Sequence, residues 1–178
     1  MKLILANKAG FTLIELLVTL MVLCVILVLA LPALGTILMN NRLKASSDLF
    51  VNALNYARST ALSESVTVVV CPLSALNSSN CGTHWSSGWI VVTQPASGVN
   101  TLLQSQQSTS TDPTLSGTTT GIFFDPHGLS STQSNFTFCD SRGSSFAQSV
   151  VVMVTGYIQS GSTPGQAVWD SSMLSCPS

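Results

Sequence analysis

Residues that could act as nucleophiles, bases or metal ligands are few in this chain of 178 residues. It has two histidines, His84 and His127, five cysteines and 13 charged side chains. Asp125 lies near His127 and serines are abundant, but no Gly-x-Ser-x-Gly turn surrounds any serine. We interpret both histidines as loop residues. No glycine-rich phosphate loop is present either, so we expect no enzymatic activity and no cofactor.

The cysteines are the second group of candidates for chemistry. Cys24 falls in a long apolar segment and is interpreted as a small packing residue. The other four lack the Cys-x-x-Cys spacing of structural zinc sites, so we expect no bound metal. They permit three disulfide pairings, and whether they pair depends on the redox compartment. These four are Cys71, Cys81, Cys139 and Cys176.

One carboxylate, that of Glu15, stands at the start of a strongly apolar segment. From Leu16 to Leu34 only Thr19 and Pro32 interrupt the apolar residues. As a helix this segment would be about 30 Å long, enough to cross the hydrocarbon core of a membrane. A carboxylate in such a helix costs about 3 kcal/mol unless it is paired or near the end. Glu15 therefore counts against a cleaved secretory signal and against a plain membrane anchor.

The overall composition excludes two classes of protein. Only 7% of the residues are charged, whereas a soluble domain carries roughly a quarter. The net charge of −1 excludes disorder driven by charge and a strongly basic nucleic-acid binder. The low charge and the apolar segment together indicate that part of the chain lies in a membrane.

The elements that must position these residues begin with one long helix. Apolar residues recur on one helical face of segment 39–62. We predict a helix from about Phe11 to about Leu62, roughly 75 Å long, with this face packed on the domain that follows. Pro32 is expected to kink or loosen it. The predicted face consists of Leu43, Phe50, Leu54, Ala57 and Ala61.

Beyond Glu64 the sequence changes to short β-like runs separated by Gly, Pro, Ser and Asn. We predict an α+β fold in which a mostly antiparallel β domain packs on the second half of the helix. Trp85 and Trp89 are expected in its core. Residues 105–120, nearly all Ser, Thr and Gln, are predicted to be a mobile loop. The predicted strands are 67–71, 89–93, 122–124, 136–139, 149–155 and 157–159, the last two forming a hairpin.

The amino-terminal motif KAGFTLIE, residues 8–15, resembles the type III signal of type IV pilins and type II secretion pseudopilins. This resemblance implies a leader at 1–10, cleaved after Gly10 by a prepilin peptidase, with Phe11 becoming the N-methylated terminus. Residues 11–38 would then form the transmembrane and filament-core helix. In the family, the carboxylate corresponding to Glu15 pairs with the terminal amine of a neighbouring subunit. Two charges that are each costly in lipid offset one another in this way, which favours assembly.

Motifs in residues 63–178 are similar to the core strands of the GspH/FimT group of minor pilins and minor pseudopilins. This resemblance implies a single-pass inner-membrane precursor with a periplasmic β domain, assembled at the tip or initiation complex of a type IV pilus. Expected partners are other minor and major pilins, the prepilin peptidase, the inner-membrane assembly platform and the inner membrane itself. A type II secretion pseudopilin and a DNA-binding competence pilin remain alternatives. The motifs are Cys71, Trp85, GWIVV at 88–92, FFDPHG at 123–128, FCDSRG at 138–143 and 150–156.

The implied periplasmic location is oxidising, so the four cysteines after the apolar segment are expected to form disulfides. Among the three pairings we favour Cys71–Cys81 and Cys139–Cys176. The first closes a short loop, and the second attaches the carboxyl-terminal tail to a core strand. Each bond is expected to contribute about 2–4 kcal/mol to stability.

Some FimT-like pilins carry a Gly-Arg-x-Arg motif for DNA in the carboxyl-terminal hairpin. Here the matching residues are GYIQ at 156–159, so both arginines are replaced by neutral residues. Tyr157 could stack on a base, and Arg142 is the single cation after Ser63, against five carboxylates. Because DNA binding requires several cations to neutralise phosphates, we do not expect nucleic acid as a partner.

Overall fold

The computed structural model describes residues 10–76, 78–108 and 112–177, with residues 29–33 described by their backbone alone. Residues 1–9 of the expected leader therefore lie outside the described part. The chain divides into two compact units, Met1–Met39 and Asn40–Ser178. Each unit is considered by itself below.

One helix, α1, runs from Leu13 to Glu64, close to the predicted bounds. Thr12 precedes it as the N-cap, since its hydroxyl accepts a hydrogen bond of 3.3 Å from the Glu15 N–H. Ser65, with a φ of 53°, follows its last residue. The backbone stays helical at Pro32, whose ring lies outside the described side chains, so the expected kink stays a prediction. Among the described residues, no helical stretch combines the length and the apolar character needed to cross a membrane.

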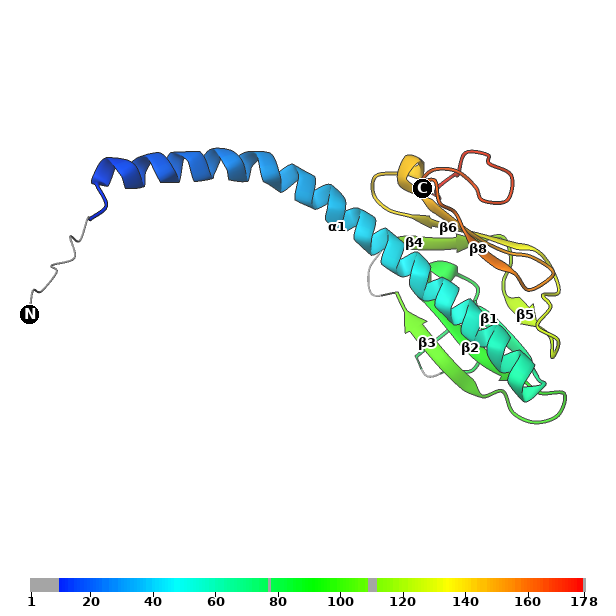
Figure 1. The fold of residues 1–178 in the computed structure, drawn as a ribbon. Helices are drawn as coiled ribbons and strands as arrows, with labels where there is room; N and C mark the ends of the chain where they lie inside the picture. Colours follow the sequence, from blue (N-terminus) through cyan, green and yellow to red (C-terminus); the bar gives the residue numbers. More distant parts are fainter. Residues whose placement is uncertain (1–9, 77, 109–111, 178) are drawn as a thin grey trace, which may run out of the picture. The chain divides into compact units, whose positions relative to one another are not determined.

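Within the part of the chain that the structure describes, eight strands form two antiparallel sheets in the second unit (Figure 1). The first sheet has the order β3-β2-β1-β5 and the second β4-β6-β7-β8. The predicted α+β class with a mostly antiparallel β domain is therefore confirmed. The bounds are β1 Thr67–Pro72, β2 Gly88–Gln94, β3 Leu102–Gln107, β4 Thr114–Gly117, β5 Ile122–Phe124, β6 Ser134–Cys139, β7 Gln148–Val152 and β8 Ile158–Ser160.

The prediction of a loop over residues 105–120 is wrong. Strand β3 extends to Gln107 and pairs with β2, and β4 lies within the segment and pairs with β6. Both are edge strands with mostly exposed or half-exposed side chains, and in β4 only Leu115 is buried. Backbone pairing with an apolar neighbour thus forms strands from polar residues. The predicted carboxyl-terminal hairpin is confirmed, although β7 ends at Val152 rather than at residue 155.

The core of the second unit is built around Phe50. Its ring makes edge contacts with two tryptophans and two phenylalanines at centroid distances of 4.9–5.8 Å. These partners are Trp85, Trp89, Phe136 and Phe138. All five residues of the predicted helical face are at most 2% exposed, and Trp85 and Trp89 are buried, so both core predictions are confirmed. The apolar face of α1 and both sheets share this core (Figure 1).

Candidate assembly sites

The amino-terminal site consists of three exposed residues, Gly10, Phe11 and Glu15. The Phe11 side chain is 81% exposed, and no atom lies within 4 Å of a Cβ built on Gly10. This backbone is therefore open to a peptidase. Glu15 lies in the first turn of α1, at the third helical position. Thr12 and Glu15 have the Thr-x-x-Glu spacing of a capping box, a signal that our sequence interpretation did not use.

The apolar side chains that the structure describes in the first unit are exposed. Those from Leu13 to Val28 and from Leu34 to Met39 form no buried face. A soluble helix normally exposes a polar stripe, whereas a helix that is apolar on every side is expected where lipid or other helices cover it. The described apolar side chains of the first unit are therefore suited to contact with lipid or with other helices.

Both favoured disulfides are formed in the structure. Cys71 bonds to Cys81 with a Cα–Cα distance of 5.5 Å, and Cys139 bonds to Cys176 with 5.8 Å. The first joins β1 to the loop before β2. The second fixes the tail to the end of β6, where Cys139 packs in a small cluster with Ala147, Ala167 and Leu174. Cys24 is exposed and free.

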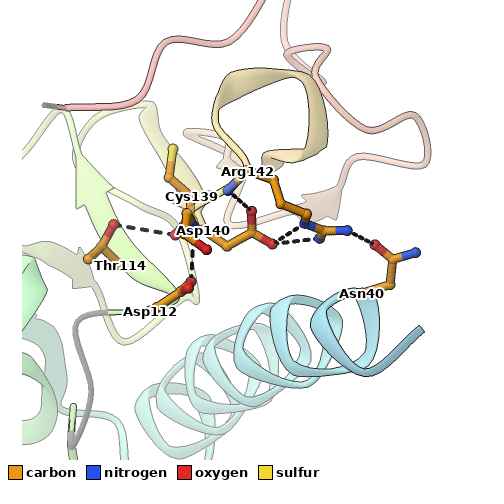
Figure 2. Close-up of polar contacts among 7 residues, drawn as sticks. Asn40, Asp112, Thr114, Cys139, Asp140 and Arg142 are labelled. Carbon is orange, nitrogen blue, oxygen red and sulfur yellow. Dashed lines mark hydrogen bonds and ion pairs between the residues drawn. The ribbon is translucent and has the colours of Figure 1, made fainter. Parts of the chain in front are cut away.

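The sequence candidate Arg142 lies in a half-buried polar cluster (Figure 2). Its guanidinium donates to Asp140 through two nitrogens, from Nε at 3.0 Å, and to the Asn40 side-chain oxygen at 2.7 Å. The guanidinium also lies over the Phe146 ring at 4.2 Å. The side chains of Arg142 and Asp140 are only 15% and 4% exposed. The one cation after Ser63 is thus engaged inside the domain and is poorly placed to meet a phosphate.

The segment between β6 and η2 (Ser144–Phe146) owes its shape to the same carboxylate. Oδ1 of Asp140 accepts a bond from the Arg142 backbone N–H at 3.0 Å, while Oδ2 receives the guanidinium. Nearby, the Ser141 N–H donates to Asp112, which adjoins β4 (Figure 2). Asn40, at the start of the second unit, is therefore joined to the turn that follows β6.

The turn between β7 and β8 contains the other sequence candidate, Tyr157, which is 54% exposed. Arg58 of α1 supports this turn by donating to the carbonyls of Gly128 at 3.0 Å and Thr155 at 3.3 Å. Sequence reasoning missed this role of Arg58. The structure does not bring Tyr157 and Arg142 into one cationic site, because Arg142 is held at Asn40 and Asp140.

Gly156 gives a test of how tightly this turn is fixed. Its φ is +74°, and a Cβ there would overlap the Gly128 carbonyl oxygen. We expect Gly156→Ala to lower the free energy of unfolding by about 2–4 kcal/mol, from backbone strain plus the clash. The matched control is Gly143→Ala, where φ is +89° but nothing lies within 4 Å, so about 1–2 kcal/mol is expected. Urea unfolding of both variants measures the change in the free energy of unfolding. Equal decreases for the two variants would show that the clash at Gly156 contributes nothing.

Two exposed aspartates organise turns in the β domain. The N–H groups of Leu129 and then His127 donate to the Asp125 carboxylate and hold its pKa below the ordinary 3.8. The Ser172 hydroxyl and then its N–H lower the pKa of Asp170 in the same way. A lowered folded-state pKa contributes stability above the unfolded pKa, which is lost as the pH falls through the folded value. Any such contribution is thus present in full at neutral pH and is lost only as the solution is acidified.

The two histidines lie on the surface. His127 is exposed beside Asp125, with Nδ1 and Oδ2 3.7 Å apart, and His84 is exposed at the start of η1 (Trp85–Ser87). Within residues 10–76, 78–108 and 112–177, no group of three His, Cys, Asp or Glu side chains could hold a metal ion.

A methylation-type amino terminus, a helix with an exposed apolar first half and two antiparallel sheets define a pilin-like protein. Residues 46–156 match the family model described as type II transport protein GspH, and residues 5–31 match the prokaryotic N-terminal methylation motif. The chain therefore belongs to the GspH family. No curated protein sequence matches it.

Two crystal structures of the type IV minor pilin FimU from Pseudomonas aeruginosa have a similar fold. One, in space group P21, superposes with a TM-score of 0.54 at 18% identity and covers 69% of this chain and 95% of FimU. The other, in space group P65, superposes with a TM-score of 0.53 at 18% identity and covers 67% of this chain and 92% of the FimU chain. At this identity the likeness concerns the fold.

Proposed function

We propose that this protein is a minor type IV pilin that is processed at Gly10–Phe11 and assembled at the pilus tip or initiation complex. The observation that carries the proposal is the methylation motif at residues 5–31, together with the first part of α1, where the described side chains of residues 13–28 and 34–39 form no buried face. Such a segment requires lipid before assembly and neighbouring helices afterwards. The similarity to FimU, a type IV minor pilin, supports a role in a type IV pilus rather than in type II secretion.

The location and partners follow from this proposal. The precursor would be a single-pass protein of the inner membrane with residues 63–178 in the periplasm, where both disulfides are stable. The prepilin peptidase would cut it, and the inner-membrane assembly platform would insert residues 11–38 among other minor and major pilins. The β domain would present a surface specific to its neighbouring subunits.

A minor pseudopilin of type II secretion is the second candidate. The description of the matching family, a type II transport protein, favours it specifically. The physics of processing and assembly would be the same, because both machines use a methylated apolar helix as the filament core. The difference lies only in which machine receives the subunit.

Deleting the gene in its host separates the two candidates. We expect loss of surface pili and of twitching with normal exoprotein secretion, restored by the wild-type gene on a plasmid. The control is a strain that lacks the prepilin peptidase and should lose both processes. Loss of secretion with intact pili would reject the pilus assignment and support the pseudopilin.

DNA reception is the third and weakest candidate. From Ser63 onwards the chain carries one cation and five carboxylates, a net charge of −4, and Arg142 is already paired. We expect the 40–178 fragment to show no shift of double-stranded DNA at low salt, because a β domain with one cation cannot displace many counterions from the DNA phosphates. A matched variant, Tyr157→Arg with Gln159→Arg, restores the motif and tests whether the fold can bind. A clear shift by the wild-type fragment would contradict this prediction.

A further inference from the structure

The outer face of the second sheet carries a groove that the assembly sites do not use. Residues 169–175 of the tail form one wall, and the outward side chains of β4 and β6 form the floor. The groove has a volume of about 300 Å³, within the range of small-ligand sites. Its lining includes Ser116, Thr118, Asn135, Thr137 and Trp169.

Strand alternation explains why the floor is polar. Phe136 and Phe138 of β6 point into the core, so Asn135 and Thr137 point outwards. Ser116 of β4 lies opposite Thr137, and the Thr118 hydroxyl accepts a bond from the Asn135 N–H at 3.1 Å. The floor is thus a flat array of hydroxyl and amide groups on two paired strands.

The tail wall is held firmly in place. The Cys139–Cys176 disulfide fixes its end, and the Ser149 hydroxyl of β7 donates to the Gln166 carbonyl and accepts from the Val168 N–H, both at 3.0 Å. Leu174 is buried, and its N–H donates to the Gly165 carbonyl at 2.9 Å. A wall fixed in this way is preorganised, so a ligand would lose little energy in ordering it.

Polar groups of the floor remain available for a ligand. Among the described residues, neither the Thr137 hydroxyl nor the Asn135 side-chain NH₂ makes a hydrogen bond, whereas the Asn135 oxygen accepts one from Gln133. Trp169 is half-buried in the wall and offers an apolar ring surface with one N–H donor. None of the described lining residues is charged.

We propose that this groove binds a neutral carbohydrate. A sugar presents hydroxyls that donate and accept at once, which matches side chains of the Asn and Thr type. It also presents apolar C–H faces, which pack on an indole. The absence of charge among the described lining residues disfavours an anionic or cationic ligand, and the polar floor disfavours a purely apolar one. The site lies outside the processing motif, so the inference goes beyond the proposed function and does not depend on it.

The test uses the full-length protein in a detergent without a sugar headgroup, on an array of immobilised neutral oligosaccharides, with sialylated ones for comparison. Neutral oligosaccharides that bind are then titrated in solution by tryptophan fluorescence. Trp85 and Trp89 are buried, so a spectral change on binding should come from Trp169. We expect binding of at least one neutral oligosaccharide, accompanied by such a change.

Variants separate the groove from the rest of the surface. Thr137→Val and Asn135→Ala should weaken binding at least tenfold with unchanged unfolding curves, because each removes an available polar group. The control Thr83→Val alters an exposed threonine outside the groove and should bind as wild type. Failure to bind any neutral oligosaccharide, equal binding by all variants, or preferential binding of sialylated chains would overturn the proposal. If none binds but an Asn135→Arg variant fails to enter filaments, the groove serves a protein partner instead.

Discussion

Replacing Glu15 with alanine is expected to leave the protein in the inner membrane and to reduce its incorporation into filaments more than tenfold. After cleavage, the amine of Phe11 would be a cation in an apolar surrounding, and the carboxylate of a neighbouring Glu15 would be its counter-charge. An unpaired charge at this depth costs about 2.5–3.5 kcal/mol or more, which is roughly two orders of magnitude in an equilibrium constant. Removing one partner therefore removes most of the driving force for docking.

Glu15→Gln distinguishes this charge from helix capping. Glutamine at the third helical position can still complete the capping box with Thr12, but it carries no charge. If charge pairing matters, Gln and Ala should be equally defective. Thr19→Ala is the control, since it changes an exposed, uncharged polar residue of the same helix and should assemble normally.

The measurement is quantitative immunoblotting of sheared filaments against inner-membrane fractions. All variants should show the same cleavage and the same membrane level. Wild-type incorporation of Glu15→Gln would show that the charge is dispensable and that only the cap is needed. Wild-type incorporation of both Glu15 variants would reject the pairing altogether.

The second large effect is expected at Arg142. Changing it to methionine should lower the free energy of unfolding of the 40–178 fragment by about 3–5 kcal/mol. The cause is that Asp140, whose side chain is 4% exposed, would keep a buried charge without its partner. The hydrogen bond to Asn40 and the contact with the Phe146 ring would be lost as well.

Two further variants test this explanation. Adding Asp140→Leu to Arg142→Met removes the orphaned charge and should recover a large part of the loss. Lys44→Met breaks the exposed pair with Asp48, 3.4 Å apart, and should cost no more than about 0.5 kcal/mol. Urea unfolding provides the values. If Arg142→Met lowers the free energy of unfolding by less than about 1 kcal/mol, or if adding Asp140→Leu recovers none of that decrease, the ion pair contributes little to stability.

The helix and core of this protein could be predicted because their signals are periodic. Apolar spacing of three and four residues identified the buried face around Phe50, and β-branched runs identified the central strands. The edge strands β3 and β4 could not be predicted in this way, because most of their residues are polar and the few leucines do not alternate in a clear pattern. Their pairing depends on apolar neighbours that lie elsewhere in the chain.

The candidate sites also differ in how far their residues lie apart in the sequence, and only those made of neighbouring residues could be predicted. The processing motif is contiguous, so Gly10, Phe11 and Glu15 could be identified from sequence, although their roles remain predictions. Arg142 was considered a weak DNA candidate because the sequence did not show that its side chain is already engaged. One of its partners, Asn40, lies 102 residues away in the sequence. The link between Arg58 and the β7–β8 turn was hidden for the same reason, since Gly128 is 70 residues away.

The Arg142 cluster also has a mechanical consequence. Tension applied along α1 of an assembled subunit would enter the second unit at Asn40, the residue held by the Arg142 guanidinium. From Asp140 that force passes to Cys139 at the end of β6, an interior strand paired on both sides. The tail is attached at the same point by a covalent bond. Such a force would therefore reach a strand that is hydrogen-bonded to neighbours on both sides and covalently joined to the carboxyl-terminal tail.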